Sequence, residues 1–226
     1  MAFPNARYER KFVARAYSLA EALAAVKRHP ALFREIYPAR TVNNIYLDTA
    51  GFKAYFEHAN GAADRVKTRI RWYGPVGGAI EAPTLERKLK CGLVGGKLSY
   101  PLQPIYMNGS VPCREIEDAF GHARIPELLR EELRGLRPVL VNRYGRRYFL
   151  SGDGAIRLTV DSEIEFFGTR GAMGWDAPVR PAPMIVVELK FDPAHADQVA
   201  RITNRFPFRM TRCSKYVMGI EAVGMM

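Results

Sequence analysis

Basic side chains recur at every second position of several segments whose patterning is typical of β-strands. Residues 65–73, with the sequence RVKTRIRWY, place four cations on one face: Arg65, Lys67, Arg69 and Arg71. Successive side chains of a strand point to opposite faces, so the residues between them share the other face. Like charges about 7 Å apart repel by roughly 2 kcal/mol per pair at an effective dielectric near 20. Such a row therefore favours an anionic ligand that neutralises it.

Four further segments repeat this alternation and add carboxylates among the cations. Their charged positions are Glu9 and Lys11; Glu86, Lys88 and Lys90; Arg157, Asp161, Glu163 and Glu165; and Glu188 and Lys190. One strand of this kind is most simply the solvated side of an antiparallel sheet. Five such strands favour a ligand-binding face. Carboxylates beside a phosphate ligand could hold Mg²⁺ or Mn²⁺, since both ions bind carboxylate and phosphate oxygens.

The elements that position these residues are mostly strands. Period-two patterning predicts eight of them, over residues 7–14, 42–48, 65–73, 84–90, 97–103, 139–149, 156–167 and 184–191. Capping signals predict fewer helices: from the capping box of Ser18 and Glu21 to about His29, from Asp48 and Thr49 to about Glu57, over 126–134, from Asp192 to about Asn204, and after Ser214. We expect an α+β, mainly β fold in a single domain over residues 1–226.

Composition narrows the class of protein. The 226 residues carry 34 Lys and Arg against 23 Asp and Glu, a net charge of +11, and 25 of the cations are Arg. Arg has a rigid fork that suits phosphate oxygens, so a polyanionic partner is indicated. The longest uncharged stretch, Leu98–Cys113, contains three prolines and predicts no membrane span. Three widely spaced cysteines and a charged N-terminus favour a soluble, cytoplasmic protein.

In combination, the motifs resemble the catalytic domain of the vacuolar transporter chaperone (VTC) polyphosphate polymerases, within the triphosphate tunnel metalloenzyme superfamily. The landmarks are RYERKF (7–12), VNNIYLDT (42–49), RIRWYG (69–74), LERK (85–88), NRYGRRYF (142–149), RLTVDSEI (157–164), VVELK (186–190) and RCSKY (212–216). The resemblance runs from Arg7 to about Glu221. It implies a closed antiparallel eight-stranded β-barrel, with a charged tunnel inside and helices outside.

The resemblance also implies an activity: the γ-phosphoryl group of ATP passes to a growing inorganic polyphosphate chain, and ADP leaves. The partners that it implies are ATP and inorganic polyphosphate or pyrophosphate. The residues that match the catalytic cations are Arg69, Arg71, Lys88 and Lys215. Those that match phosphate-binding positions are Lys11, Lys67, Lys97, Arg143, Arg157, Lys190, Arg212 and Ser214, and Arg146 or Arg147 is an alternative to Arg143. Glu188 matches the ligand of Mn²⁺ or Mg²⁺, and Asp161, Glu86 and Glu9 are second choices.

Other functions stay open beside the polymerase. The hydrolytic branch of the superfamily, with adenylate cyclase and thiamine triphosphatase relatives, carries Glu-x-Glu-x-Lys on its first strand. Here Arg7 replaces the first Glu, which weakens the case for metal-assisted triphosphate hydrolysis but does not exclude this activity. A polyanion-binding module without chemistry is a third possibility. Nucleic acid is not expected as a partner, because a tunnel excludes a duplex. A separately encoded membrane partner is compatible with the sequence.

Overall fold

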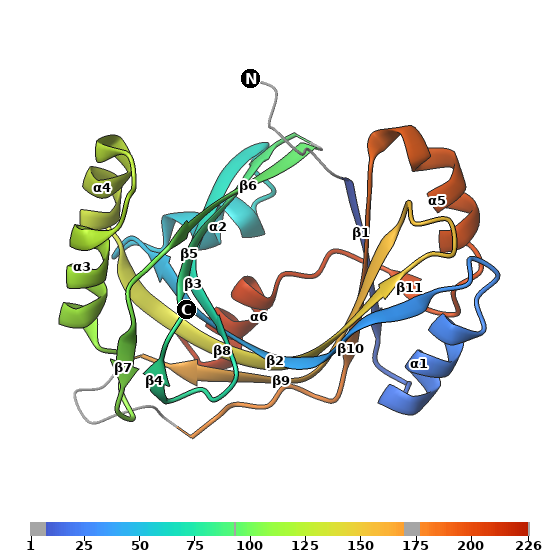
Figure 1. Cartoon of the computed structure of the whole chain (residues 1–226), viewed down its shortest axis with the longest axis horizontal. Coiled ribbons are helices and arrows are strands. Elements are labelled where there is room, and N and C mark those ends of the chain that lie inside the picture. Colours follow the sequence, from blue (N-terminus) through green and yellow to red (C-terminus); the bar gives the residue numbers. More distant parts are fainter. Residues whose placement is uncertain (1–7, 93, 170–176, 226) are drawn as a thin grey trace. The chain divides into compact units, whose positions relative to one another are not determined.

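The computed structural model describes residues 8–92, 94–169 and 177–225, and it consists mainly of β-strands (Figure 1). The strands are β1 (Tyr8–Ala14), β2 (Arg34–Asp48), β3 (Asp64–Tyr73), β4 (Gly78–Ile80), β5 (Thr84–Cys91), β6 (Val94–Pro101), β7 (Ile105–Met107), β8 (Arg137–Leu150), β9 (Arg157–Gly168), β10 (Ile185–Phe191) and β11 (Arg209–Met210). The helices are α1 (Leu19–Lys27), α2 (Lys53–Ala59), α3 (Cys113–His122), α4 (Glu127–Arg134), the 3₁₀ turn η1 (Pro193–His195), α5 (Ala196–Thr203) and α6 (Lys215–Ala222). Arg7 lies outside the described residues.

The expected closed eight-stranded barrel is wrong. Nine strands form one open sheet in the order β11-β1-β10-β9-β8-β2-β3-β5-β6, and β4 pairs with β7 separately. Within the described residues β6 and β11 are the edges of that sheet, and no pairing joins them. The alternation of charged and apolar side chains is the same in an open sheet as in a barrel, so the sequence pattern cannot report closure.

The chain divides into two compact units. Unit 1 comprises Met1–Thr41, Tyr144–Ile164 and Arg180–Ser214, and unit 2 comprises Val42–Arg143, Glu165–Val179 and Lys215–Met226. Strands β2, β8 and β9 contribute residues to both units.

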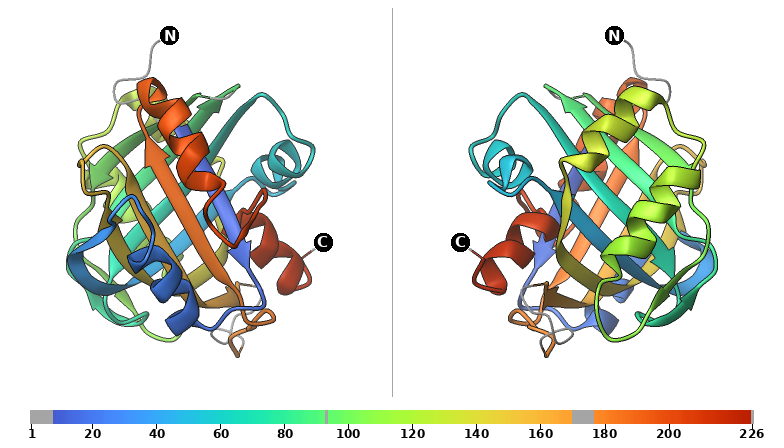
Figure 2. Two further views of the ribbon diagram at one scale, coloured as in Figure 1. Left: turned by 90° about the vertical axis from the view of Figure 1, so that its right-hand side faces the viewer. Right: turned by 90° about the vertical axis from the view of Figure 1, so that its left-hand side faces the viewer.

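Unit 2 buries one face of its strands beneath two helices. Ile45, Ile70 and Leu85 from β2, β3 and β5 pack with Phe120 of α3 and Leu133 of α4 in one apolar core. The right-hand view of Figure 2 shows α3 and α4 over this face. The alternate residues of β3 and β5, including Lys67, Arg69, Arg71 and Lys88, therefore point to the face opposite these helices. Arg87 of β5 lies on the helix side, where it pairs with Glu132 of α4 at 2.6 Å.

Unit 1 follows the same plan with different helices. Val26 of α1 and Val199 of α5 share an apolar core with Phe12, Leu158 and Leu189 from β1, β9 and β10. The left-hand view of Figure 2 shows α1 and α5 beside these strands. The charged residues that alternate with these core residues, Glu9, Lys11, Arg157, Asp161, Glu188 and Lys190, again point away from the helices. Arg10 of β1 is an exception, because it lies on the helix side and donates to Thr203 Oγ1 of α5 at 3.0 Å.

The predicted capping residues accept or exchange hydrogen bonds with backbone N–H groups near the helix starts. Ser18 caps α1, and its backbone N–H donates to Glu21 Oε2 at 2.8 Å, which completes the capping box. Asp48 and Thr49 act on α2 from the end of β2, because Asp48 accepts from the backbone N–H groups of Ala54 and Tyr55 at 3.0 Å each. Asp192 accepts from the N–H of Ala194 at 3.0 Å at the start of η1. The predicted start of α1 is confirmed. The chain after Asp192 begins with η1 and continues into α5 from Ala196, and α2 begins only at Lys53, with Phe52 as its N-cap.

A left-handed residue interrupts the alternation of β9. Glu163 has a φ of 52°, which is unusual for a non-glycine residue inside a strand and typical of a bulge. The sequence pattern had placed Glu163 and Glu165 on the face of Arg157 and Asp161. In unit 2, Glu165 instead lies two residues from Phe167, a member of the core under α3 and α4.

Candidate anion-binding faces

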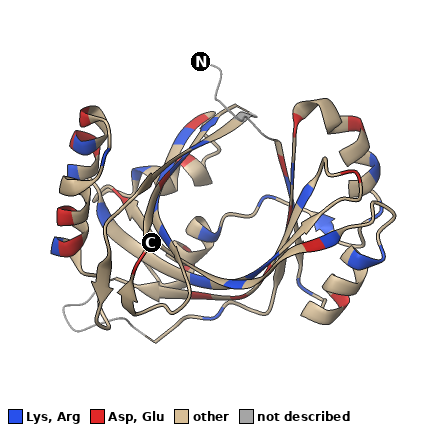
Figure 3. Cartoon of the chain, in the orientation of Figure 1, with Lys and Arg blue, Asp and Glu red and all other residues tan. Residues whose placement is uncertain are grey.

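The charged face of unit 2 carries three lysines at one register position. Lys67 of β3 lies opposite Lys88 of β5, and Lys88 lies opposite Lys97 of β6. Figure 3 shows how basic residues recur along β3 and β5. Like charges directly opposite each other in a sheet destabilise it. This rung of lysines is therefore a place where a polyanion would stabilise the protein.

Glu86 is the carboxylate at the centre of the same face. Its Oε2 accepts from Arg69 Nε at 2.9 Å and from Arg69 Nη2 at 2.7 Å, and it lies 3.5 Å from Arg71 Nη1. Its Oε1 accepts from Lys97 Nζ at 2.7 Å. Glu86 is buried. Both of its oxygens are thus engaged by cations, so Glu86 holds Arg69, Arg71 and Lys97 in place.

Electrostatics keep Glu86 ionised. Burial alone would raise the pKa of its carboxyl, but the charges of Arg69 and Arg71 and the hydrogen bond from Lys97 outweigh it. The pKa of Glu86 is therefore held well below its usual range. The stability that this shift contributes is present above the ordinary glutamate pKa, near 4.5, and is lost as pH falls below it.

Glu86→Gln is expected to lower the free energy of unfolding at pH 7 by about 3 kcal/mol, because it removes the buried charge that Arg69, Arg71 and Lys97 share. The variant should also lose part of the decline in stability that the wild type shows as pH falls below 4.5. Urea unfolding between pH 7 and pH 3 measures both effects. Glu132→Gln is the control, since Glu132 on α4 pairs with Arg87 while half exposed, and less than about 1 kcal/mol is expected there. Equal effects of the two changes would contradict this role of Glu86.

A chain of side-chain amides fixes Arg71 on this face. Arg71 Nε donates to Asn44 Oδ1 at 3.1 Å, and Asn44 Nδ2 donates to Asn142 Oδ1 at 2.8 Å. An arginine has donors only, so the carbonyl of Asn44 must face it, and this sets the orientation of both amides. Both asparagines are fully buried. Both lie in landmark segments, but the sequence assigned them no role, because an Asn on a strand carries no signal that tells a structural hydrogen bond from a ligand contact.

Helix α6 places Lys215 next to an anchored tyrosine. Tyr216 packs on Tyr46 with ring centroids 5.0 Å apart, and its hydroxyl donates to Asp48 Oδ2. Burial and the neighbouring Asp48 carboxylate raise the pKa of Tyr216, so it remains a donor. A side chain at Gly219 would collide with Leu140 and Phe166, so only glycine lets α6 pack this closely. Lys67 Nζ lies 6.0 Å from the Tyr216 ring.

The charged face of unit 1 is built by register between three strands. Lys11 of β1 lies opposite Glu188 of β10, which lies opposite Thr159 of β9. In the next rung Glu9 lies opposite Lys190, which lies opposite Arg157. Glu188 is buried, and its oxygens lie 3.3 Å from Lys11 Nζ and 3.0 Å from Lys190 Nζ. Five of the predicted site residues thus share one patch: Glu9, Lys11, Arg157, Glu188 and Lys190.

The segment after β11 joins this patch. The backbone N–H of Thr211 donates to Lys11 O at 2.9 Å, and Lys11 Nζ donates to Cys213 O at 3.3 Å. Arg212 and Ser214 flank that carbonyl in sequence. Burial lowers the pKa of Lys11, but Glu188, Glu9 and Cys213 raise it by more, so Lys11 stays cationic.

Asp161 forms a buried bidentate pair with Arg146. Arg146 Nε lies 2.6 Å from Asp161 Oδ1, and Arg146 Nη2 lies 2.7 Å from Oδ2. The Asp161 side chain is 0% exposed and the Arg146 side chain 10%. The structure therefore places Arg146, the alternative to Arg143, on this charged face. Arg143 lies in unit 2, two residues from the core residue Val141, so alternation places it on the core side of β8, 3.9 Å from Glu165.

The residues present fit a divalent metal only in part. In the described ranges no group of three His, Cys, Asp or Glu side chains is arranged to hold a metal. Asp161 and Glu86 give both oxygens to close hydrogen bonds of 2.6–2.7 Å from arginine or lysine. Glu188 also contacts cations, but these are two lysines at 3.3 and 3.0 Å. Glu188 and Glu9 are hard oxygen donors on neighbouring rungs, and Mg²⁺ is commonly bound by one or two carboxylates plus substrate phosphates. This pair therefore suits a metal that arrives with a phosphate ligand.

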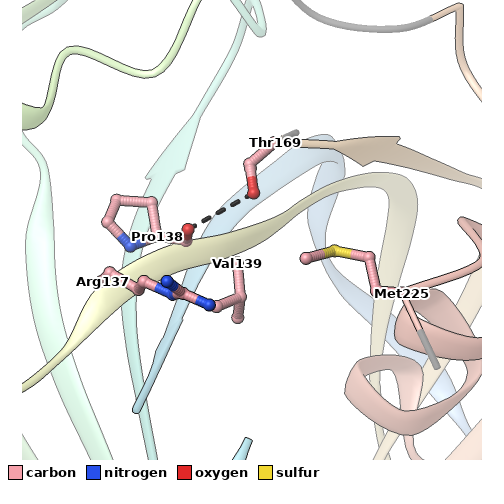
Figure 4. A pocket seen from close by; sticks show the side chains of 5 residues that line it. All are labelled: Arg137, Pro138, Val139, Thr169 and Met225. Atoms are coloured by element: carbon pink, nitrogen blue, oxygen red, sulfur yellow. Dashed lines mark hydrogen bonds between the residues drawn. The ribbon is translucent and has the colours of Figure 1, made fainter. Parts of the chain in front are cut away.

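A pocket of about 210 Å³ lies elsewhere in unit 2. Arg137, Pro138, Val139, Thr169 and Met225 line it. Figure 4 shows the hydroxyl of Thr169, which donates to the Pro138 carbonyl at 3.3 Å. Among the described residues that line this pocket, none is a predicted site residue and none carries a carboxylate.

The comparisons with known proteins define the family. The family model for the VTC domain matches residues 6–224, so the chain belongs to the VTC domain family. No curated protein matches the chain in sequence. No helix of the described residues is long and apolar enough to cross a membrane.

Solved structures share the fold at low sequence identity. A protein from Pyrococcus horikoshii is 16% identical, with a TM-score of 0.51 and coverage of 96% of this chain and 98% of that one. A putative adenylate cyclase from Vibrio parahaemolyticus is 13% identical, with a TM-score of 0.50 and coverage of 93% and 97%. A putative adenylyl cyclase from Hippeastrum, described as having a dominant triphosphatase activity, is 13% identical, with a TM-score of 0.52 and coverage of 96% and 95%.

Proposed function

We propose that this VTC domain is a polyphosphate polymerase that transfers the γ-phosphoryl group of ATP to a growing inorganic polyphosphate chain and releases ADP. The observation that carries the proposal is the rung of Lys67, Lys88 and Lys97 in a chain of this family. A linear anion with closely spaced charges matches a row of cations at the spacing of adjacent strands, about 4.8 Å.

Phosphoryl transfer needs mainly positioning and charge neutralisation, because little covalent chemistry falls to the protein. Arg69 and Arg71 suit this role, since Glu86 and Asn44 fix their guanidinium groups before any ligand binds. Lys88 and Lys215 would add charge at the reacting phosphates. Phosphate binding is proposed for Lys67 and Lys97 in unit 2 and for Lys11, Arg157, Lys190, Arg212 and Ser214 in unit 1.

Glu188, with Glu9 as the second carboxylate, is the proposed holder of Mn²⁺ or Mg²⁺. A bound divalent ion would neutralise charge on the phosphate oxygens. Lys11 and Lys190 contact Glu188 in the protein. They are therefore placed to move from the carboxylate to phosphate oxygens when a metal and triphosphate bind. Asp161 and Glu86 are proposed to balance cations instead.

A triphosphatase is the second candidate. The specific observation in its favour is the fold shared with the Hippeastrum protein, described as having a dominant triphosphatase activity. The same cations and carboxylates serve when water replaces the polyphosphate end as the acceptor. The two functions differ only in the product.

The test is a product assay. The purified protein is incubated with ATP, Mn²⁺ and a small amount of pyrophosphate, and the products are separated on a polyphosphate gel beside an ADP assay. A ladder of long chains with matching ADP is expected. Phosphate release without a ladder would establish the triphosphatase instead. An absence of turnover, combined with stabilisation against heat by tripolyphosphate, would indicate a polyanion-binding module.

A further inference from the structure

A buried hydroxyl on the charged face of unit 1 makes no hydrogen bond. Thr159 is 8% exposed, and its Oγ1 has no partner among the described residues. Leu158 and Val160 on either side of it belong to the apolar core, so Thr159 points to the opposite face. Buried hydroxyls are normally paired, because an unpaired one forfeits its hydration without compensation. This exception therefore calls for a missing partner.

The surroundings of Thr159 indicate the charge of that partner. Thr159 lies directly opposite Glu188, whose two oxygens are engaged by Lys11 and Lys190. Along β9 its neighbours on the same face are Arg157 and Asp161, and Arg146 neutralises Asp161. With the carboxylates held by cations, the hydroxyl has a basic environment and no acceptor of its own. An oxyanion would be drawn there by the cations and would accept from the hydroxyl.

We propose that Thr159 donates a hydrogen bond to a nonbridging phosphate oxygen of the bound triphosphate or polyphosphate chain. This inference rests on the proposed function, because it takes the same face as the phosphate site. It adds a neutral donor to a set of cations. A hydroxyl fixes the direction of one phosphate oxygen, whereas a lysine ammonium group acts as a point charge.

Calorimetric titration of tripolyphosphate into the protein in the presence of EDTA tests the proposal without metal or turnover. Thr159→Val keeps the side-chain shape and removes the donor, and about ten-fold weaker binding is expected. Thr159→Ser restores the hydroxyl and should bind within about two-fold of the wild type. The unliganded valine variant should melt at the wild-type temperature or above it, since an unpaired buried polar group is gone.

Three results would overturn the inference. The first is equal affinity of the valine variant and the wild type. The second is a loss of affinity in the serine variant as large as in the valine variant, with a lowered melting temperature in both. That result would show that Thr159 acts through the packing of its side chain. The third is a loss that appears only when Mn²⁺ is present, which would assign the hydroxyl to the metal. If the product assay shows no turnover but the valine variant binds tripolyphosphate more weakly, the proposed reaction fails and the role of Thr159 stands.

Discussion

Glu188→Gln is expected to reduce Mn²⁺-dependent turnover of ATP by at least about 100-fold while sparing the affinity for tripolyphosphate in EDTA. Removal of a metal's charge from the transition state costs several kcal/mol, and an amide is a poor ligand for a hard cation. Lys11 and Lys190 lie 3.3 and 3.0 Å from the Glu188 carboxylate. They keep their charge in the variant and lose a competing anion, so phosphate binding should be unchanged or stronger.

Steady-state ADP release with Mn²⁺ and calorimetry without it measure the two halves of this prediction. Glu35→Gln is the matched control, because Glu35 also lies in unit 1 and pairs with a cation, Arg147, at 3.4 Å. The control should retain full turnover. Turnover that survives in Glu188→Gln would contradict the metal assignment. Loss of tripolyphosphate binding in EDTA would show that Glu188 acts by positioning the lysines.

Asp161→Asn is expected to lower the melting temperature by roughly 10 °C. The change leaves the Arg146 guanidinium, whose side chain is 10% exposed, without the carboxylate that pairs with it. Burial lowers the pKa of Arg146, but the neighbouring groups, Asp161 first among them, raise it by more. An arginine cannot lose its proton to relieve this, so the buried charge persists. Breaking a buried pair from one side typically costs 3–5 kcal/mol.

The double variant Asp161→Leu/Arg146→Met should recover most of the lost stability, since replacement of a whole buried ion pair by apolar residues is often neutral. Differential scanning calorimetry of the wild type and both variants makes the comparison. A normal melting temperature for Asp161→Asn, together with weakened Mn²⁺ binding, would show instead that Asp161 is a metal ligand.

Residue alternation predicted the strands and their faces well. All eight predicted strands are present, and the cations of β3 and the charged residues of β1, β5 and β10 lie on the faces that period-two patterning gave. The helix α3 was missed because Pro112 precedes it without a side-chain cap, and three prolines lie shortly before it. The first half of β2, residues 34–41, was missed because it is almost wholly exposed and carries no alternation.

The remaining differences depend on backbone geometry and pairing. The left-handed Glu163 shifts the side chains that follow it, and no glycine or proline signals this. The choice between Arg143 and Arg146 depends on the register of β8. Glu86 and Asp161 have the residue type of metal ligands, but their oxygens are taken by cations from neighbouring strands. Alternation within one strand cannot report which partner lies across the sheet.

Calorimetric titration of tripolyphosphate into Lys88→Gln and Lys53→Gln tests most directly whether the lysine rung is the anion site. Both variants remove one lysine and lower the net charge of +11 equally. Lys88 lies between Lys67 and Lys97, whereas Lys53 is an exposed residue of α2. We expect about ten-fold weaker binding for Lys88→Gln and wild-type binding for Lys53→Gln. Equal affinities for the two variants would show that net charge alone attracts the anion, and would contradict the site.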